Sequence, residues 1–542
     1  MKQSTDATWL KGCLILAIGL GICFRFVNLD GKVYWHDEVY TTFRAAGFSR
    51  QEIDRELFQN RRFAAPELLK FQHIKPGSTA ADTVSSLATE DPQHPPLYFL
   101  MARGWMHWFG GSMTATRSLP ALLSLLSLPL MYALGRELFN SSLMALLATT
   151  FLALSPFDIL FAQTARQYSL LTVVVIGSSW LLLKAIRRST VQNWGWYALS
   201  GAIGLYTHPF FGLTAIGHGV YVLLMSVSFR QRDSCTEPAS APTFSLAFMP
   251  FVKRWQFSIR FLMAMLVSLV LYFPWFVVLF DNYQRASATT SWTKGSVSIV
   301  FLVKQWILSF TALFIDLNFT FSDLFAILLR LPFIFLIGCA IYLVHQRTPR
   351  LTGLFILTSI LMPFLLLALP DVVLGGQRSA ASRYLISSFP GVQLAVAYLF
   401  AIGLTRGKWV WRSILGLVLA SSLISCVISA QATTWWSKSV SYFNAEVAQA
   451  VNAIASTEPT ILISDPGSDF TNTGDLISLS YKLNGTVQLF LAGKSPNLDE
   501  VADQPNLLLF RPSQSLETAI DQRGWQLEPI SHPGKLWQIK KG

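Results

Sequence analysis

The stretch Tyr34-Trp35-His36-Asp37-Glu38-Val39-Tyr40-Thr41-Thr42 decides how this chain is interpreted. It follows an apolar run, 14–27, and a short polar turn, 28–31, so two acids stand where the chain leaves a hydrophobic segment. Carboxylates near a membrane face must stay hydrated, pair with cations or hold a metal ion. Asp37 and Glu38 could instead cap the next helix, since Asp is common at a helix N-terminus. The rest of the chain has to distinguish these two interpretations.

The composition indicates a membrane protein built of helices. Of the 542 residues, 52% are hydrophobic and 13% are charged, whereas soluble proteins carry about 25% charged residues. Repeated long apolar runs predict a mainly α, polytopic fold. The net charge of +12 does not indicate nucleic acid, because the basic residues lie in short loops between apolar runs. The five cysteines have neither metal-site spacing nor the pattern of a disulfide framework.

The apolar runs predict about 11 transmembrane helices that form a module over residues 1–430. Lys2 and Lys11 precede the first run and predict a cytoplasmic N-terminus. Basic loops such as 184–188 and 230–256 are expected on the same side of the cell (inner or plasma) membrane. The expected spans are 10–27, 117–138, 143–161, 169–183, 194–206, 213–229, 259–280, 324–344, 351–369, 384–404 and 414–429.

Two longer segments are expected on the outer face. The first, 28–116, contains an apolar piece at 94–109 that is short for a span and is interrupted by Arg103 and His107. We expect an amphipathic helix on the outer face there; if it crossed instead, the sidedness of every later loop would change. The second segment, 281–322, has its own apolar piece at 297–314, which is expected to be re-entrant or to lie on the surface.

From about residue 431 the pattern changes to short β-rich runs. A helix is expected over 442–451, and Gly, Pro and Asp separate the strand-like runs that follow it. Residues 431–542 are therefore expected to form a small extracytoplasmic α/β domain on the same side as Asp37. The expected strands are 460–463, 487–491, 506–510 and 536–539.

The expected topology gathers polar residues at the outer ends of the spans. A carboxylate can take a proton from an acceptor hydroxyl, and arginines can hold a phosphate. A histidine can orient a substrate, donate a proton or bind a metal. Together these residue types suit transfer from an anionic, lipid-linked donor. The candidates are Asp37, Glu38, His94, Gln163, Arg166, Tyr168, His208, Arg378, Arg383 and Tyr384.

Each candidate also has a purely structural interpretation. His208 precedes a proline and can end a helix, and His94 precedes two prolines and can begin one. Arg166 can extend towards the membrane interface, Arg383-Tyr384 can anchor a span there, and Tyr168 can be packing. Their arrival together on one face, rather than any single residue, favours a site.

Six short motifs resemble the membrane-embedded GT-C glycosyltransferases that use polyprenyl-phosphate sugars, and in particular family 39. That family includes the protein O-mannosyltransferases and the lipid A aminoarabinose transferases. The resemblance runs to about residue 212, with islands beyond it. The motifs are Trp35-His36-Asp37-Glu38, His94-Pro95-Pro96-Leu97-Tyr98, Arg117-Ser118-Leu119-Pro120-Ala121-Leu122, the segment from Ser155-Pro156 to Arg166-Gln167-Tyr168-Ser169-Leu170, Tyr206-Thr207-His208-Pro209 and Ser382-Arg383-Tyr384-Leu385.

The resemblance implies a role for several candidates. Asp37 would be the catalytic carboxylate, which activates an acceptor hydroxyl for inverting attack at the anomeric carbon, with Glu38 in support. Arg383 would bind the lipid phosphate, with Arg166 and His208 near the donor or a metal ion. The remaining candidates would line the donor site, Tyr384 beside the phosphate.

The loop after the third expected span departs from the family pattern. Families of this fold often carry a second carboxylate there, but 163–168 contains no acid and Asp158 lies a few residues earlier. Metal dependence is therefore open, with Asp37, Glu38 and His208 as the candidate ligands.

The expected function is transfer of a sugar from a polyprenyl-phosphate donor to a hydroxyl of a protein, lipid or glycan on the outer face. The sequence has no Gly-rich phosphate loop that would indicate a nucleotide donor. A transporter or flippase of lipid-linked envelope precursors is an alternative, but it would place charges in mid-span, where this chain has few. A non-catalytic subunit of an envelope complex is the other alternative, and it would keep product formation when the candidate residues are changed.

Overall fold

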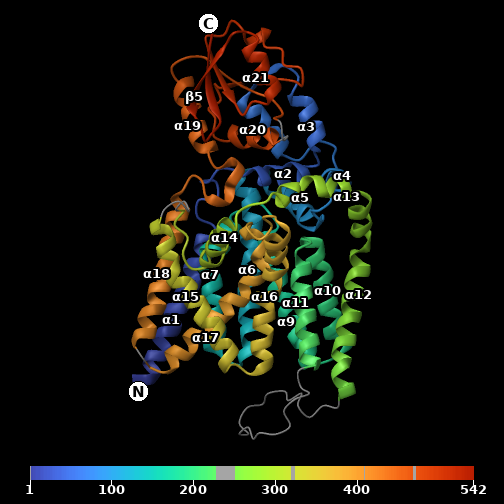
Figure 1. Cartoon of the computed structure of the whole chain (residues 1–542), viewed down its shortest axis with the longest axis vertical. Helices are drawn as coiled ribbons and strands as arrows, with labels where there is room; N and C mark the ends of the chain where they lie inside the picture. Colours follow the sequence, from blue (N-terminus) through green and yellow to red (C-terminus); the bar gives the residue numbers. More distant parts are fainter. Residues whose placement is uncertain (1, 228–250, 319–323, 408, 468–470, 542) are drawn as a thin grey trace.

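The computed structural model describes residues 2–227, 251–318, 324–407, 409–467 and 471–541. Figure 1 shows two parts stacked along the long axis: a helical bundle with the N-terminus at its far end, and a sheet region that contains the C-terminus. Helices α2 (His36–Ala46) and α5 (Leu97–Phe109) lie between the two parts. Residues 228–250 lie outside the described residues; they include Cys235 and most of the expected basic loop, 230–256.

The helices of the bundle begin and end at recognisable signals. Ser112 begins α6 because its side-chain oxygen accepts a hydrogen bond from the amide of Ala115. Helix α7 ends ahead of Pro156, which occupies the first turn of α8. The bundle helices are α1 (Lys2–Phe24), α6 (Met113–Phe139), α7 (Ser142–Ala153), α8 (Pro156–Ala162), α9 (Tyr168–Arg187), α10 (Val191–Thr207), α11 (Phe211–Val227), α12 (Phe251–Asp281), α15 (Leu324–Arg347), α16 (Arg350–Leu374), α17 (Phe389–Thr405) and α18 (Trp409–Gln431).

Seven helices in the described part of the chain are long and apolar enough to cross a membrane. The bent pair α7 and α8, with a 55° angle at the break, makes eight if it is one span. The other expected spans correspond to shorter helices: Thr8–Phe24, Val191–Thr207 and Phe211–Val227. The count of eleven therefore stays a prediction. The seven are Met113–Phe139, Tyr168–Arg187, Trp255–Asp281, Phe325–Arg347, Arg350–Leu374, Ser382–Thr405 and Trp409–Ser441.

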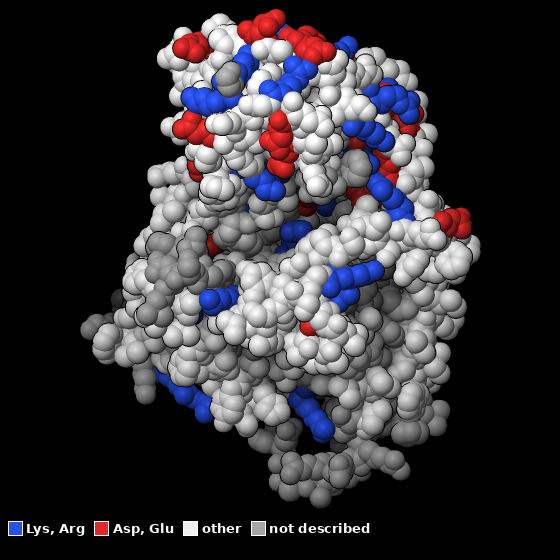
Figure 2. All heavy atoms as spheres, turned by 45° about the horizontal axis from the view of Figure 1, so that its top comes forward, with Lys and Arg blue, Asp and Glu red and all other residues white. Residues whose placement is uncertain are grey.

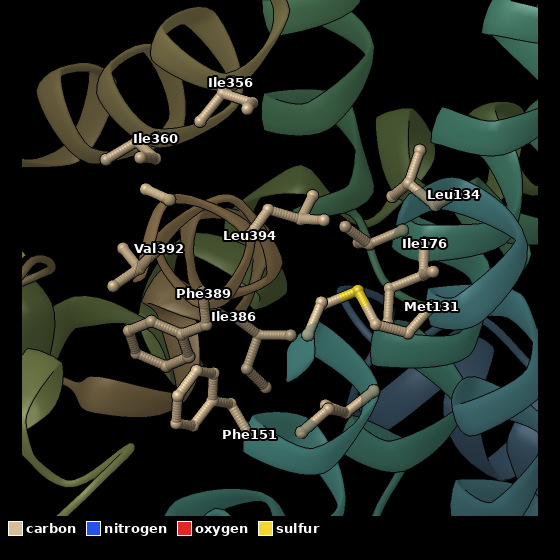
Figure 3. Close-up of a cluster of buried hydrophobic side chains, with 14 of the residues drawn as sticks. Met131, Leu134, Phe151, Ile176, Ile356, Ile360, Ile386, Phe389, Val392 and Leu394 are labelled. Carbon is tan, nitrogen blue, oxygen red and sulfur yellow. The ribbon is translucent and has the colours of Figure 1, made fainter. Parts of the chain in front are cut away.

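Helix α17 forms the centre of the bundle, with 94% of its span buried. Figure 3 shows its side chains surrounded by apolar side chains of α6, α7, α9 and α16. At the periphery of the bundle, α1 and α7 are in close backbone contact. A Cβ on Gly21 would lie 2.1 Å from the carbonyl oxygen of Ala153, so the two helices can approach this closely only because position 21 is glycine. The labelled core residues are Met131, Leu134, Phe151, Ile176, Ile356, Ile360, Ile386, Phe389, Val392 and Leu394.

The sheet region contains six strands in the order β1-β3-β2-β4-β6-β5. Strands β3, β2 and β4 are parallel and the others are antiparallel to their neighbours. The central strands are apolar on both faces because α19 (Asn444–Ala455), α20 (Asn472–Ser480) and α21 (Gln514–Asp521) accompany the sheet. The strands are β1 (Arg61–Ala64), β2 (Thr460–Ser464), β3 (Gln488–Leu491), β4 (Asn506–Phe510), β5 (Gln526–Ser531) and β6 (Leu536–Lys540).

The sheet is not built from the C-terminal segment alone. All four expected strands are present, but the sequence did not predict β5, nor β1, which comes from the first external segment and pairs with β3. One apolar cluster joins Phe43 of α2 and Leu68 to Val451 and Leu489. The first external segment and the C-terminal region therefore share a core.

The remaining helices cover the end of the bundle that faces the sheet. The expected helix over 94–109 is α5, which is not among the candidate spans of the described residues and lies across the end of the bundle (Figure 1). The apolar piece expected at 297–314 contains α14, which has 13 residues. The covering elements are α4 (Ala80–Glu90), α13 (Tyr283–Thr289), η4 (Ser291–Lys294), α14 (Ile299–Thr311), η5 (Ser382–Ser388) and η6 (Trp436–Ser441). Two others, α3 (Arg50–Leu57) and η1 (Ala65–Gln72), instead contact α20 of the sheet region.

Candidate active site

The Asp-Glu pair lies in the first turn of α2, between the bundle and the sheet region. Trp35 precedes the helix, and its backbone N–H donates to Glu38 Oε2 at 2.9 Å. Glu38 therefore does cap the helix, which is one of the two interpretations that the sequence left open. Figure 2 shows a hollow on this face between the two parts, with basic side chains inside it.

Glu38 is fully buried and both of its oxygens are occupied. Arg117 of α6 donates to them with Nε and Nη2, each at 2.8 Å. Lys438 Nζ donates to Oε2 at 2.7 Å, and the amide of Ala165 donates to Oε1 at 2.7 Å. Burial alone would raise the pKa of Glu38, but the charges of Arg117 and Lys438 outweigh it and lower the pKa to about 2. Glu38 thus ties α2 to three other segments and has no oxygen left for a substrate.

Asp37, the neighbouring acid, has the opposite environment. It is partly exposed, and its carboxylate makes no hydrogen bond or ion pair to any residue that the structure describes. Its charge nevertheless acts on the side chains of Arg166 and Arg383. A carboxylate that faces cations without being paired is free to accept a proton from a substrate.

Arg166, in the loop between α8 and α9, is held by polar contacts on one side. Its Nη1 donates to Thr41 Oγ1 at 2.8 Å, and its Nη2 lies 3.0 Å from His94 Nε2. Since a guanidinium can only donate, His94 Nε2 accepts, and the proton of the neutral imidazole is assigned to Nδ1. That Nδ1 lies 3.0 Å from Asp91 Oδ2, which also contacts Arg44 at 3.0 Å. A chain of contacts from Arg44 through Asp91 and His94 therefore orients Arg166.

Arg166 also retains unused donor capacity, because its buried Nε has no hydrogen-bond partner among the described residues. Asp91 stays ionised beside it. Burial would raise the pKa of Asp91, but the N–H contact from His94 Nδ1 and the charge of Arg44 outweigh that effect and hold the pKa well below its usual range.

Arg383 in η5 is surrounded by aromatic rings instead of acids. Its guanidinium carbon lies 5.2 Å from the ring centre of Trp35, 5.2 Å from that of Tyr384 and 5.6 Å from that of Trp292. It forms no ion pair with any described carboxylate. Such cation–π contacts fix the position of the guanidinium while leaving its N–H groups available to an anion.

His208 ends α10 and faces the same cluster. Its ring centre lies 6.1 Å from that of His94 and 6.4 Å from that of Tyr168. The amide of Phe210 donates to His208 Nδ1 at 3.1 Å, so the neutral ring carries its proton on Nε2. Burial, and then the nearby His94 and Arg166, lower the pKa of His208 well below its usual value. His208 is therefore neutral at physiological pH and can donate a hydrogen bond from Nε2.

The structure brings most of the predicted site residues into one cluster but does not bring in all of them. Gln163 donates to the carbonyl oxygens of Phe24 and Val27 at 2.7 and 2.8 Å and so anchors the end of α1. Arg378 pairs at 3.2 Å with Asp371, in the last turns of α16 just before its own loop. The cluster consists of Asp37, Arg166, Tyr168, His208, Arg383 and Tyr384, with Glu38 and His94 as supporting residues.

Four residues that support this cluster were not predicted as site residues. Arg117 belongs to a motif of the sequence but was given no role there. Asp91 stands three residues before His94, and Lys438 is a lone cation after the last apolar run. Trp292, from the second external segment, is 44% exposed beside Arg383. Arg117, Asp91 and Lys438 are recognised as supporting residues because the structure buries their charges, and no sequence motif gives them that role.

The donor set around Asp37 does not fit a divalent metal ion. Among the described residues no three His, Cys, Asp or Glu side chains are grouped as ligands. Glu38 already accepts from two cations, and Asp37 faces Arg166 and Arg383. Asp158 does not supply a second carboxylate, because it lies in α8 and accepts from Gln393 at 2.9 Å. Guanidinium groups, not carboxylates, provide the charges that face Asp37.

Comparison with known proteins agrees with the resemblance seen in the motifs. Residues 93–255 match the family model of the dolichyl-phosphate-mannose-protein mannosyltransferases. That range includes His94, Arg166 and His208, but neither Asp37 nor Arg383. No curated protein matches the chain by sequence.

The solved structures that resemble the chain are distant from it in sequence. ArnT from Cupriavidus metallidurans in the apo state superposes with a TM-score of 0.51 and 14% identity, over 97% of each chain. The same protein bound to undecaprenyl phosphate gives a TM-score of 0.49 and 14% identity, over 97% of this chain and 98% of that one. The oligosaccharyltransferase AglB from Archaeoglobus fulgidus, with an inhibitory peptide and a dolichol-phosphate, gives 0.44 and 12%, over 97% and 74%.

The family match and the shared fold agree with each other. The chain has the GT-C fold of ArnT, and the match over 93–255 relates that part of it to the protein mannosyltransferases.

The buried Glu38 predicts a pH-dependent stability. Its folded-state pKa of about 2 lies below the ordinary 4.5, so its contribution is complete above pH 4.5 and is lost as the pH falls towards 2. We expect Glu38→Gln to lower the free energy of unfolding by about 3–5 kcal/mol, because Arg117 and Lys438 lose their counter-charge. Unfolding in detergent micelles at neutral and acidic pH measures this. Asp499→Asn, at an exposed ion pair, serves as the control and should change stability by about 0–1 kcal/mol.

The donor set also predicts that any reaction at this site does not need an added metal ion. Product formation in membranes should continue after treatment with EDTA, because the charges facing Asp37 come from Arg166 and Arg383. Loss of product that one divalent cation restores would contradict this assignment.

Proposed function

We propose that this chain is an integral-membrane glycosyltransferase that transfers a sugar from a polyprenyl-phosphate donor to a hydroxyl group. The single observation that carries the proposal is the carboxylate of Asp37, which pairs with no described residue and stands beside Arg166, whose Nη1 lies 3.4 Å from the backbone oxygen of Asp37; neither Arg166 nor Arg383 pairs with a described carboxylate. A free base beside anion-binding groups is what displacement of a phosphate leaving group requires. The acceptor would be a protein, a lipid or a glycan.

The reaction would be a single displacement at the anomeric carbon. Asp37 takes the proton of the acceptor hydroxyl while the oxygen of that hydroxyl forms a bond to the anomeric carbon. The bond from that carbon to the phosphate oxygen breaks, and its electron pair stays on the phosphate. Configuration at the anomeric carbon is inverted, and the products are the glycosylated acceptor and the polyprenyl phosphate.

The two arginines would hold the departing phosphate. Arg383 presents N–H groups from a position that three aromatic rings fix, and Arg166 has a free Nε. Charge-assisted hydrogen bonds of this kind strengthen as negative charge develops on the leaving group. His208 Nε2 would donate one further neutral hydrogen bond, and Tyr168 and Tyr384 would line the donor site.

The related proteins support a lipid-linked donor. The matching family model names dolichyl-phosphate-mannose as the donor of its members, and ArnT has been solved with undecaprenyl phosphate. For this chain we carry over only the common chemistry, a polyprenyl phosphate that bears a sugar. Such a donor brings its own activated leaving group, so a nucleotide site is not required.

We further propose that the site and the sheet region face the outside of the inner or plasma membrane. Helix α9 begins at Tyr168, at the site, and therefore ends with Lys184 and Arg187 at the opposite end of the bundle. His345 and Arg347 end α15 and Arg406 follows α17, and both of these helices run in the same direction as α9. Lys and Arg collect in cytoplasmic loops, which supports a cytoplasmic position for the end away from the site.

Replacing Asp37 by Asn provides the first test. Transfer from a labelled polyprenyl-phosphate sugar in membranes should fall by about 10²–10⁴-fold, because the acceptor loses its general base. Thermal stability should not fall, since the carboxylate pairs with no described residue. Unchanged transfer with Asp37→Asn would remove Asp37 from the chemistry.

The two arginines of one loop provide a matched pair for the second test. We expect Arg383→Ala to weaken binding of polyprenyl phosphate by about 10–100-fold, from the loss of charge-assisted hydrogen bonds. Arg378→Ala should change the affinity by less than about 3-fold, because the guanidinium of Arg378 pairs with Asp371. Binding to purified protein in nanodiscs measures both variants. Equal losses would show that the phosphate is held by the charge of the loop and not by Arg383.

A further inference from the structure

The sheet region touches the helix that carries Asp37. Gly474, in α20, packs so closely on α2 that a Cβ at this position would lie 2.6 Å from His36 Nδ1 and 2.6 Å from Tyr40 Cε2. Both distances are too short for carbon contacts, so only glycine allows this approach. The C-terminal region therefore packs directly against the first turns of α2.

A hydrogen-bond chain joins the same two elements. The backbone N–H of His36, one residue before Asp37, donates to Ser441 Oγ at 2.9 Å, and Ser441 Oγ donates to Asp475 Oδ1 at 2.6 Å. Asp475 is fully buried in α20 and forms an ion pair with Arg511, which follows β4. Arg511 in turn donates to the carbonyl oxygen of Val440 at 3.0 Å. An amide at the start of α2 is thus anchored to the parallel sheet.

We propose that the C-terminal sheet region positions Asp37, with Ser441 and Asp475 as positioning residues. This inference rests on the proposed function of Asp37. The first amides of a helix lack partners within the helix, so whatever accepts from them fixes the direction of its first turn. Lys438 supports the same turn through Glu38, and it too belongs to the segment that leads into the sheet region. A displacement of about 1 Å at a reacting group can cost about 10²-fold in rate.

The other role open to this region is binding of the acceptor. The polar groups of the chain argue against that role at this position. Ser441 both accepts from His36 and donates to Asp475, and both oxygens of Asp475 have partners. Groups that satisfy one another in a buried chain hold the protein together and offer little to a ligand. The two roles predict different kinetic effects.

Three variants test the proposal in the full-length protein in nanodiscs. Ser441→Ala removes the acceptor for the His36 amide, Asp475→Asn weakens its support, and Gly474→Ala pushes α20 and α2 apart. We expect each to lower kcat by about 10–100-fold, with KM for donor and acceptor within about 3-fold. Deuterium exchange at the first amides of α2 should rise, while exchange in β2 and β4 stays unchanged. Two controls should match the unmodified protein: Gly485→Ala, where a Cβ meets nothing closer than 3.9 Å, and Asp499→Asn.

Two results would overturn the proposal. A higher KM for the acceptor with unchanged kcat would make the sheet region an acceptor site, and unchanged kcat with unchanged exchange would leave it without influence on α2. If Asp475→Asn unfolds the sheet region, Ser441→Ala decides, because it leaves the Asp475–Arg511 pair intact. If the unmodified chain transfers no sugar, the proposed function fails, and the exchange measurement still tests the positioning.

Discussion

The burial of Glu38 among Arg117, Lys438 and two backbone amides is the interaction on which the site depends. Taking these charges out of water is costly, and the arrangement is stable only because every oxygen of the carboxylate is satisfied. The contacts join α2, α6, the loop before α9 and the segment after α18, with Lys438 400 positions from Glu38 in the sequence. Chain segments that are remote in sequence thus meet at one carboxylate.

That arrangement explains why two adjacent acids have different functions. Glu38 points into the protein and is completely paired, so Asp37, one residue earlier on the same turn, points elsewhere and remains unpaired. The surrounding cations are held by other means. Arg166 is oriented through His94 and Asp91, and Arg383 lies among aromatic rings. The result is a site with more positive than negative charge, suited to an anionic donor.

The sequence predicted the mainly helical fold, the positions of the long apolar helices and most of the cluster, because apolar runs and short motifs are local signals. Residues such as Asp37, Arg166 and Arg383 stand at the ends of apolar runs, so topology alone brought them to one face. The same reasoning wrongly placed Gln163 and Arg378 in the cluster. Nothing local in the sequence reveals that Gln163 donates to a carbonyl at the end of α1, or that Arg378 pairs with Asp371.

Non-local pairing accounts for what the sequence did not predict. The four residues of β1 form a strand only because β3, more than 400 positions later, offers an edge. Lys438 and Arg117 carry no pattern that distinguishes a buried cation from a basic residue at a membrane interface. The role of Gly474 depends on the close approach of α20 and α2, which only the folded chain contains.

The most direct measurement is a structure of the protein with a bound polyprenyl phosphate. We expect phosphate oxygens within about 3 Å of the Arg383 guanidinium, with the Asp37 carboxylate facing the space where the sugar would be attached and Glu38 still paired with Arg117. A phosphate bound at the other end of the bundle, or Asp37 engaged in an ion pair while the lipid is bound, would contradict it.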